Sequence, residues 1–156
     1  MSIEKVRAYF ETKNMAHRIL EFPISSATVE LAAVAVGCEP KRIAKTLSFL
    51  VEEQPILVVT AGDAKISNPK YRETFHTKAK MIPYENVETL IGHHVGGVCP
   101  FGINEGISVY LDVSLKRFET VFPAAGSENS AIELSLKELE TYANTTAWVD
   151  VCKDWE

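Results

Sequence analysis

Residues 92–106, GHHVGGVCPFGINEG, constrain the fold more than any other segment of this chain. Five of the eight glycines lie here, namely Gly92, Gly96, Gly97, Gly102 and Gly106. Glycine adopts backbone conformations that other residues avoid, and it weakens both helices and strands. The segment therefore predicts a structured loop whose backbone N–H groups can approach a carbonyl or an oxyanion. It has neither the Gly-Lys-Ser/Thr of a P-loop nor GxGxxG spacing. The alternative is a crossover loop that is glycine-rich only for steric reasons.

The segments on either side alternate between helical and extended patterns. We expect helices over residues 2–14, 28–36, 69–75, 84–91 and 137–143. We expect strands over residues 17–22, 44–51, 55–61, 79–82, 107–113, 118–124, 130–136 and 147–152. No regular strand–helix–strand order runs through them. The pattern therefore predicts the α+β class, with a mixed, mostly antiparallel, barrel-like sheet and surrounding helices in one domain over residues 1–156.

Composition and cysteine usage narrow the class of protein further. The chain has 156 residues, of which 46% are hydrophobic, enough for one domain with a real core. Its three cysteines are far apart and odd in number, which supports neither a disulfide framework nor a zinc site. We see no signal segment and no run of about 18 apolar residues. We expect a cytoplasmic protein, away from membranes, that needs no metal or other cofactor.

The charge of the chain is unevenly distributed. Sixteen basic and 21 acidic residues give a net charge of -5, which excludes a uniformly basic nucleic-acid coat. Residues 41–80 nevertheless carry 8 basic and 4 acidic groups, a local excess of +4. These basic residues either form one electropositive face or are scattered and solvated.

Three places carry residues suited to chemistry. Lys45 stands at the start of an apolar strand, where an ammonium can clamp a phosphate or polarise an ester carbonyl, although an ordinary surface lysine fits the same pattern. Cys99 with His93 and His94 suggests a thiol nucleophile, against the alternative of a buried packing cysteine. Two adjacent histidines without a third ligand make a weak metal site. Asp112 either anchors a strand end or sits in a turn.

Four segments in this order resemble the YbaK/prolyl-tRNA-synthetase-associated editing domain family. They are IAKTL at 43–47, GHHVGGVCPFGI at 92–103, VYLD at 109–112 and AAGSENSAIEL at 124–134. The resemblance covers about residues 1 to 151. It implies a compact mixed α/β barrel that hydrolyses the ester of mischarged tRNA in trans, with a synthetase as a further partner.

The resemblance also implies roles for particular residues. Lys45 matches the functional lysine of the family, and Phe22 and Thr46 match residues that line its pocket. The substrate-binding loop is matched by Gly96, Gly97, Cys99, Pro100, Phe101 and Gly102, with Asp112 and Gly126 as supporting residues. Two positions depart from the pattern: Cys99 stands where members more often have Ser or Pro, and Ala131 stands where relatives specific for Cys-tRNA have Asp. The edited amino acid is therefore left open.

An aminoacyl ester is already activated, so positioning, N–H donors and access for water suffice to hydrolyse it. We hypothesise that Lys45 anchors the terminal phosphate or the ester carbonyl, and that the backbone of residues 96–102 holds the aminoacyl carbonyl. Water then attacks with help from the ribose hydroxyl. Two alternatives remain: a non-catalytic module that binds tRNA or a synthetase, and a small-molecule esterase or thioesterase. For the first reading we expect weak, salt-sensitive tRNA binding centred on residues 41–80.

Overall fold

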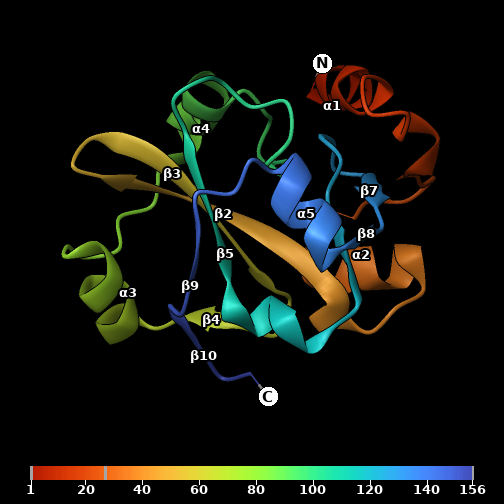
Figure 1. Ribbon diagram of the computed structural model, residues 1–156. Helices are drawn as coiled ribbons and strands as arrows, with labels where there is room; N and C mark the ends of the chain where they lie inside the picture. The colour runs from red at the N-terminus through yellow and green to blue at the C-terminus, as the bar shows by residue number, and fades with distance from the viewer. Residues whose placement is uncertain (1, 27, 156) are drawn as a thin grey trace.

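A curled six-stranded sheet forms the centre of the computed structural model, which describes residues 2–26 and 28–155 (Figure 1). The strand order is β8-β6-β2-β3-β5-β9. The strands are β2 (Ile43–Val51), β3 (Gln54–Ala61), β5 (Ser108–Asp112), β6 (Thr120–Pro123), β8 (Leu134–Ser135) and β9 (Ala147–Val149). Two short pairs complete the β structure: β1 (Ile19–Glu21) with β7 (Ser130–Ile132), and β4 (Lys65–Ile66) with β10 (Cys152–Lys153).

The pairing of these strands is mixed. The β2–β3 hairpin is antiparallel from Ala44–Ala61 to Val51–Gln54, and it is the longest ladder of the fold. Across the described residues, four strand pairings are antiparallel and three are parallel. The expected α+β fold with a mixed, barrel-like sheet is therefore confirmed, although antiparallel pairings outnumber parallel ones only when the two separate strand pairs are included. The three parallel pairings, β2–β6, β3–β5 and β5–β9, all lie in the central sheet.

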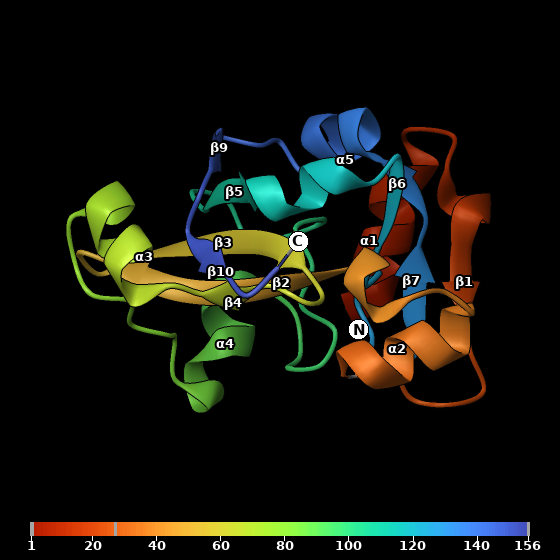
Figure 2. The ribbon, with the colours of Figure 1, turned by 90° about the horizontal axis from the view of Figure 1, so that it is seen from below.

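Five α-helices surround the sheet in the described part of the chain. They are α1 (Ser2–Glu11), α2 (Val29–Val36), α3 (Asn68–Phe75), α4 (Tyr84–Ile91) and α5 (Leu136–Tyr142), with 3-10 turns η1 (Ala16–Arg18), η2 (Pro40–Arg42) and η3 (Val113–Arg117). Figure 2 shows α4 on one side of the β2–β3 hairpin and β5, β9 and α5 on the other. Helices α1 and α2 lie at the end of the molecule that holds β6 and β7. None of the described helices is long and apolar enough to cross a membrane.

Local sequence signals place most helix ends correctly. Gly37 and Gly92 end α2 and α4 in the left-handed conformation, with φ of 83° and 103°. The start of α3 differs by one residue from the expectation, because the side chain of Ser67 accepts the hydrogen bond from the N–H of Lys70. This cap places Asn68 in the first turn of the helix.

Four of the expected strands are wrong in extent. The strand over residues 17–22 is shortened to Ile19–Glu21, because Ala16–Arg18 form a 3-10 turn. The strand over residues 79–82 is reduced to one bridge, Met81 with Phe49, because Pro83 follows and ends the pairing. The strand over residues 130–136 is divided between β7 and β8, whose partners belong to different sheets. The strand over residues 147–152 is divided into β9 and β10 at Val151, whose N–H donates to Oδ1 of Asp112 at 2.8 Å. Such divisions depend on distant partners that alternation alone does not identify.

Candidate functional site

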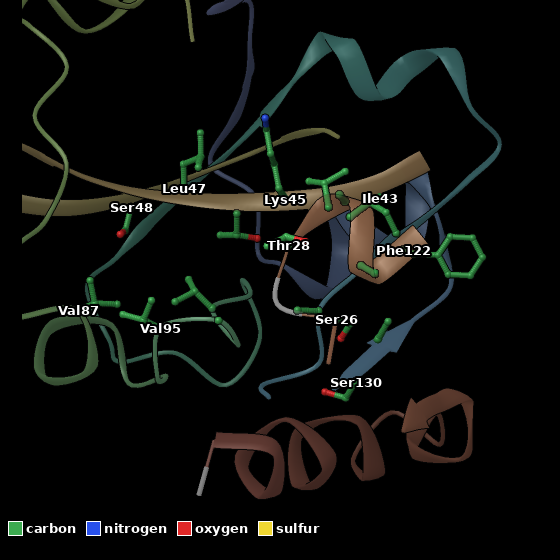
Figure 3. A pocket seen from close by; sticks show the side chains of 18 of the residues that line it. Ser26, Thr28, Ile43, Lys45, Leu47, Ser48, Val87, Val95, Phe122 and Ser130 are labelled. Atoms are coloured by element: carbon green, nitrogen blue, oxygen red, sulfur yellow. The ribbon is translucent and has the colours of Figure 1, made fainter. Parts of the chain in front are cut away.

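A cavity of about 460 Å³ opens along one edge of β2, between α2, α4 and the glycine-rich loop (Figure 3). Its lining is mostly apolar, with a few hydroxyl groups and one lysine. The lining residues are Ser26, Thr28, Val29, Ala32, Ile43, Ala44, Lys45, Thr46, Leu47, Ser48, Met81, Ile82, Tyr84, Val87, Val95, Gly96, Val98, Phe122, Ala124, Ser130 and Ala131. A concave, mostly apolar site with few polar groups is typical of small-molecule recognition.

The edge of β2 that faces this cavity is interrupted. On that edge, pairing with β6 covers only Ile43 and Ala44. Pairing resumes at Ser48, whose carbonyl accepts from the N–H of Ile82 at 3.1 Å, and continues where the N–H of Leu50 donates to the carbonyl of Lys80 at 2.8 Å. Within the described residues, no strand therefore pairs with this edge of β2 between these two points, whereas β3 pairs with the other edge throughout.

Thr46 lies in the middle of this interruption. Backbone groups of successive strand residues point alternately to the two neighbouring strands. Since Ser48 and Leu50 direct theirs away from β3, Thr46 does the same, and its N–H and C=O point to the cavity. The Thr46 hydroxyl is also buried and finds no hydrogen-bond partner among the described residues. Buried polar groups in proteins nearly always have a hydrogen-bond partner. A ligand in the cavity can therefore form hydrogen bonds with three groups of Thr46, namely its N–H, its C=O and its hydroxyl.

Lys45 is the one residue with a charged side chain among the described residues that line the cavity. It is half-buried, and burial lowers the pKa of its ammonium, an effect that the nearby Cys152, Asp63 and Glu30 partly offset. Figure 3 shows its side chain rising from β2 on the side opposite to Ser48. The ammonium therefore lies on the face of β2 opposite to Ser48, Val87 and Val95, although Lys45 is one of the residues that line the cavity.

In the glycine-rich loop, Gly96 lines the cavity, and Gly97 packs against the backbone of Gly126 and Ser127. A Cβ built on Gly97 would lie 2.7 Å from the carbonyl carbon of Gly126 and 2.7 Å from the N of Ser127. Gly126 has a φ of 96°. The two predicted glycines thus allow two backbone segments to touch, and this contact positions Gly96 next to the β7 residues Ser130 and Ala131.

The other predicted substrate-binding residues of the loop, residues 99–102, are not among those that line the cavity. Phe101 is buried and packs edge-on against Phe10, with ring centroids 4.9 Å apart. Pro100 and Gly102 line a different hollow of about 280 Å³ beside α1 and α5. The geometry therefore gives these residues a packing role in the loop, and their predicted part in substrate binding stays a prediction.

Cys99 and His93 do meet, but in the core. The Cys99 Sγ lies 3.6 Å from Nε2 of His93, and both side chains are fully buried. Burial raises the pKa of the Cys99 thiol to about 12, so the thiol stays protonated. His93 Nε2 also lies 2.6 Å from the carbonyl of Phe101, a bond that cross-links the loop. His94 pairs instead with Glu88 at 3.0 Å, and the described residues contain no group of three metal-ligating side chains.

Phe22 and Asp112 also lie outside the lining of this cavity. The backbone of Phe22 exchanges bonds with Asn129, which ties the chain before α2 to the segment that leads into β7. Asp112 is fully buried, and its carboxylate accepts from the N–H groups of Ser114 and Val151 at 2.9 and 2.8 Å. The carboxylate thus joins the end of β5 to the C-terminal segment, as expected for an anchor of a strand end.

The basic residues of segment 41–80 are partly paired with acidic ones. Lys41 contacts Glu39 at 3.5 Å, and Lys70 contacts Asp150 at 3.1 Å. Arg42 contacts Glu133 at 3.3 Å. Their charge is therefore compensated locally, and Lys45 is the basic side chain of this segment that reaches the cavity.

Sequence reasoning missed much of the cavity wall. Met81, Tyr84 and Val87 come from the segment before α4 and from the helix itself, and Val29 and Ala32 come from α2. Their helical spacing shows one apolar face, but which part of that face borders a cavity depends on packing against β2. No local signal could have identified them.

A family model described as the aminoacyl-tRNA editing domain matches residues 25–142. The matched region contains β2, the glycine-rich loop and the whole lining of the cavity. The chain belongs to the aminoacyl-tRNA editing domain family, and the resemblance found in the sequence is confirmed.

Individual relatives agree with this assignment. The uncharacterized protein YwhH of Bacillus subtilis (strain 168) is 55% identical over 157 residues and matches the whole of both chains. A proline–tRNA ligase of Bacillus cytotoxicus is 29% identical over 111 residues, which are 69% of this chain and 19% of the ligase. The chain thus matches about a fifth of that larger enzyme.

Solved structures show the same fold. A protein described as a candidate trans-editing enzyme for prolyl-tRNA synthetase superposes with a TM-score of 0.87 at 29% identity, over 97% of both chains. The hypothetical protein APE2540 superposes with a TM-score of 0.84 at 27% identity, over 96% of this chain and 99% of the other. The expected single α+β domain with a barrel-like sheet is therefore shared with these proteins.

Proposed function

We propose that this protein is an aminoacyl-tRNA deacylase that hydrolyses the ester bond of mischarged tRNA in trans, in the cytoplasm. The observation that carries the proposal is the interrupted edge of β2, which presents the Thr46 peptide group and hydroxyl to the cavity beside Lys45. Membership of the editing domain family supports the reaction class. The full-length match to a candidate trans-editing enzyme supports action on tRNA released by a synthetase.

The residues of the cavity suit a reaction that needs positioning more than a nucleophile. In the proposed step, a water oxygen forms a bond to the ester carbonyl carbon. The bond from this carbon to the ribose oxygen breaks, the ribose oxygen takes up one proton of the water, the other proton passes to solvent, and the amino acid leaves as a carboxylate. In this proposal, the backbone N–H groups of Thr46 and Gly96 donate hydrogen bonds to the oxyanion that develops in between.

The remaining lining supplies orientation. The carbonyl and hydroxyl of Thr46 suit an ammonium donor such as the α-amino group of the substrate. Lys45, the one charged residue among the described lining residues, binds the terminal phosphate or the ester carbonyl in this proposal, and the neighbouring ribose hydroxyl assists the attacking water. The buried Cys99 takes no part, because its thiol is protonated and closed off from the cavity.

A deacylation panel tests the proposal. Alanyl, cysteinyl, seryl and prolyl esters on tRNA are incubated with the wild-type protein, Lys45→Ala and the control Lys41→Ala, whose ammonium contacts Glu39 and does not line the cavity. We expect hydrolysis of at least one mischarged ester, a loss of at least tenfold in kcat/KM with Lys45→Ala, and wild-type rates with the control. Near wild-type rates of Lys45→Ala on every ester would remove Lys45 from the mechanism.

The same panel separates the two other functions that the sequence leaves open. Retained tRNA binding with no hydrolysis of any ester indicates a non-catalytic module that binds tRNA or a synthetase. Equal activity on simple aminoacyl esters and on tRNA esters indicates a small-molecule esterase. Ala131 lines the cavity at the position where the family resemblance implies an Asp in relatives specific for Cys-tRNA. The comparison of the cysteinyl ester with the other esters is therefore the most informative one.

A further inference from the structure

Large apolar side chains that line the cavity remain exposed at its mouth. Tyr84 is 75% exposed, Met81 is 57% exposed and Val95 is 43% exposed. Solvent-exposed aromatic and methionine side chains at the entrance of a binding cavity are costly to leave uncovered, and they commonly mark a contact surface. The mouth of the cavity therefore suits a flat or apolar part of a ligand, while the polar part of the same ligand lies deeper in the cavity.

Tyr84 differs from every other tyrosine of the chain. The sequence contains five tyrosines. Tyr9 and Tyr142 both pack against Phe10, and Tyr71 and Tyr110 both pack against Phe75. Among the described residues, no aromatic ring contacts that of Tyr84. A ring that is 75% exposed and has no aromatic partner among the described residues is available to stack on a ligand.

The backbone under Tyr84 is firmly held. Tyr84 is the first residue of α4, which is anchored by the buried side chains of Val87 and Ile91. The segment before it is tied to β2 by the bridge between Met81 and Phe49 and by the bonds of Lys80 and Ile82. The backbone that carries the ring is therefore held in place at the edge of the cavity, which reduces the ordering cost of binding.

We propose that Tyr84, with Met81 beside it, forms a stacking platform for the terminal adenine of the tRNA while the aminoacyl group occupies the cavity. This inference rests on the proposed function. The nucleotide esterified to the amino acid is an adenosine in every tRNA, so its base must lie within a nucleoside's length of the reacting carbonyl. Stacking on an aromatic ring is a general way to hold an unpaired base. The exposed Lys78 and Lys80 precede this platform in sequence and suit the phosphates of the same strand.

Kinetics with matched substrates test the platform. Tyr84→Ala, Tyr84→Phe, Tyr84→Trp and the control Val34→Ala are compared; Val34 is 73% exposed on α2 and does not line the cavity. The substrates are a mischarged tRNA, the same amino acid on adenosine, and its methyl ester. We expect Tyr84→Ala to raise KM for the tRNA and adenosine esters about tenfold with little change in kcat. We expect unchanged hydrolysis of the methyl ester, and near wild-type behaviour of Tyr84→Phe, Tyr84→Trp and Val34→Ala.

Other results would overturn the platform. An unchanged KM of Tyr84→Ala excludes stacking, and an equal loss with Tyr84→Phe assigns the role to the hydroxyl group instead. A loss that extends to the methyl ester places Tyr84 against the acyl group. A loss that occurs only when a synthetase is present identifies the mouth as a protein contact.

A binding measurement keeps this test separate from the proposed function. The probe is the trinucleotide CCA carrying a non-hydrolysable aminoacyl amide, titrated by calorimetry into the wild-type protein and the same variants. If the wild-type protein binds it and Tyr84→Ala binds about tenfold more weakly, the platform stands even where no ester is hydrolysed. If the wild-type protein hydrolyses esters but both proteins bind the probe equally, the platform fails and the deacylase function stands.

Discussion

Replacing Gly97 with alanine tests whether the contact behind the cavity is as tight as the structure indicates. The added Cβ would lie 2.7 Å from Gly126 C and 2.8 Å from Gly126 O. Both atoms belong to the main chain, so no side-chain rotation relieves the overlap. Overpacking of this kind costs about 1–3 kcal/mol, and we expect the upper half of this range, about 2–3 kcal/mol. For a domain of this size each kcal/mol lowers the melting temperature by roughly 2–4 °C, so a decrease of about 5–10 °C is expected.

Gly106→Ala is the matched control within the same loop. No atom lies within 4 Å of a Cβ at Gly106, but its φ of +85° disfavours a side chain. This strain costs about 1 kcal/mol. Thermal unfolding followed by circular dichroism, with urea unfolding as a check, gives both differences. Because Gly97 carries no such positive φ, only the backbone contact makes its replacement costly. If Gly97→Ala melts within 2 °C of the wild-type protein, or above Gly106→Ala, the reasoning about this contact is wrong.

Three further predictions concern buried groups. Iodoacetamide at pH 8 should add at most one group per folded chain, at Cys38, because Cys99 and Cys152 are both buried and burial raises the pKa of both thiols, that of Cys99 to about 12. Two or three adducts by mass spectrometry would contradict this. Asp112→Ala should lower the free energy of unfolding by about 2–4 kcal/mol, because two buried N–H groups lose their acceptor. Asp112→Asn should lower it by less. Equal urea midpoints for the wild-type protein and both variants would contradict this. Burial lowers the pKa of His93 below its ordinary 6.5, so as pH decreases through 6.5 the unfolded chain takes up a proton before the folded chain does, and the stability of the fold should decrease. Urea midpoints at pH 7.5 and 5.5 measure this decrease. His93→Gln should make the decrease smaller, whereas the control His17→Gln, at an exposed residue, should leave it unchanged.

Features of the fold that depend on neighbouring residues could be predicted from the sequence. The β2–β3 hairpin follows from two β-branched runs joined by a polar turn, and the glycines after α2 and α4 mark the helix ends. The parallel pairing of β3 with β5 could not be predicted in this way, since it joins segments about fifty residues apart. The same holds for β4 and β10, which have two residues each and exist only because they pair.

The candidate site, like the fold, could be predicted from the sequence only in part. Lys45, Thr46 and Gly96 were identified through the family pattern, and the structure brings all three to one cavity. The sequence also suggested a Cys99–His93 pair, which exists, but it could not show that the pair is buried in the core. Tyr84 lies outside the quoted motifs, and it reaches the cavity only because α4 packs beside β2.

The gap in the pairing of β2 has a consequence for how such a protein can evolve. A peptide N–H and C=O are present whatever the side chain, so mutation cannot easily remove the groups that Thr46 presents. Exchanges at Val98 or Ala131 would alter the size of the acyl group that fits while the main-chain contacts persist. A scaffold of this type separates the conserved part of recognition from the variable part, and new selectivities would be accessible through single substitutions that leave the folded backbone in place.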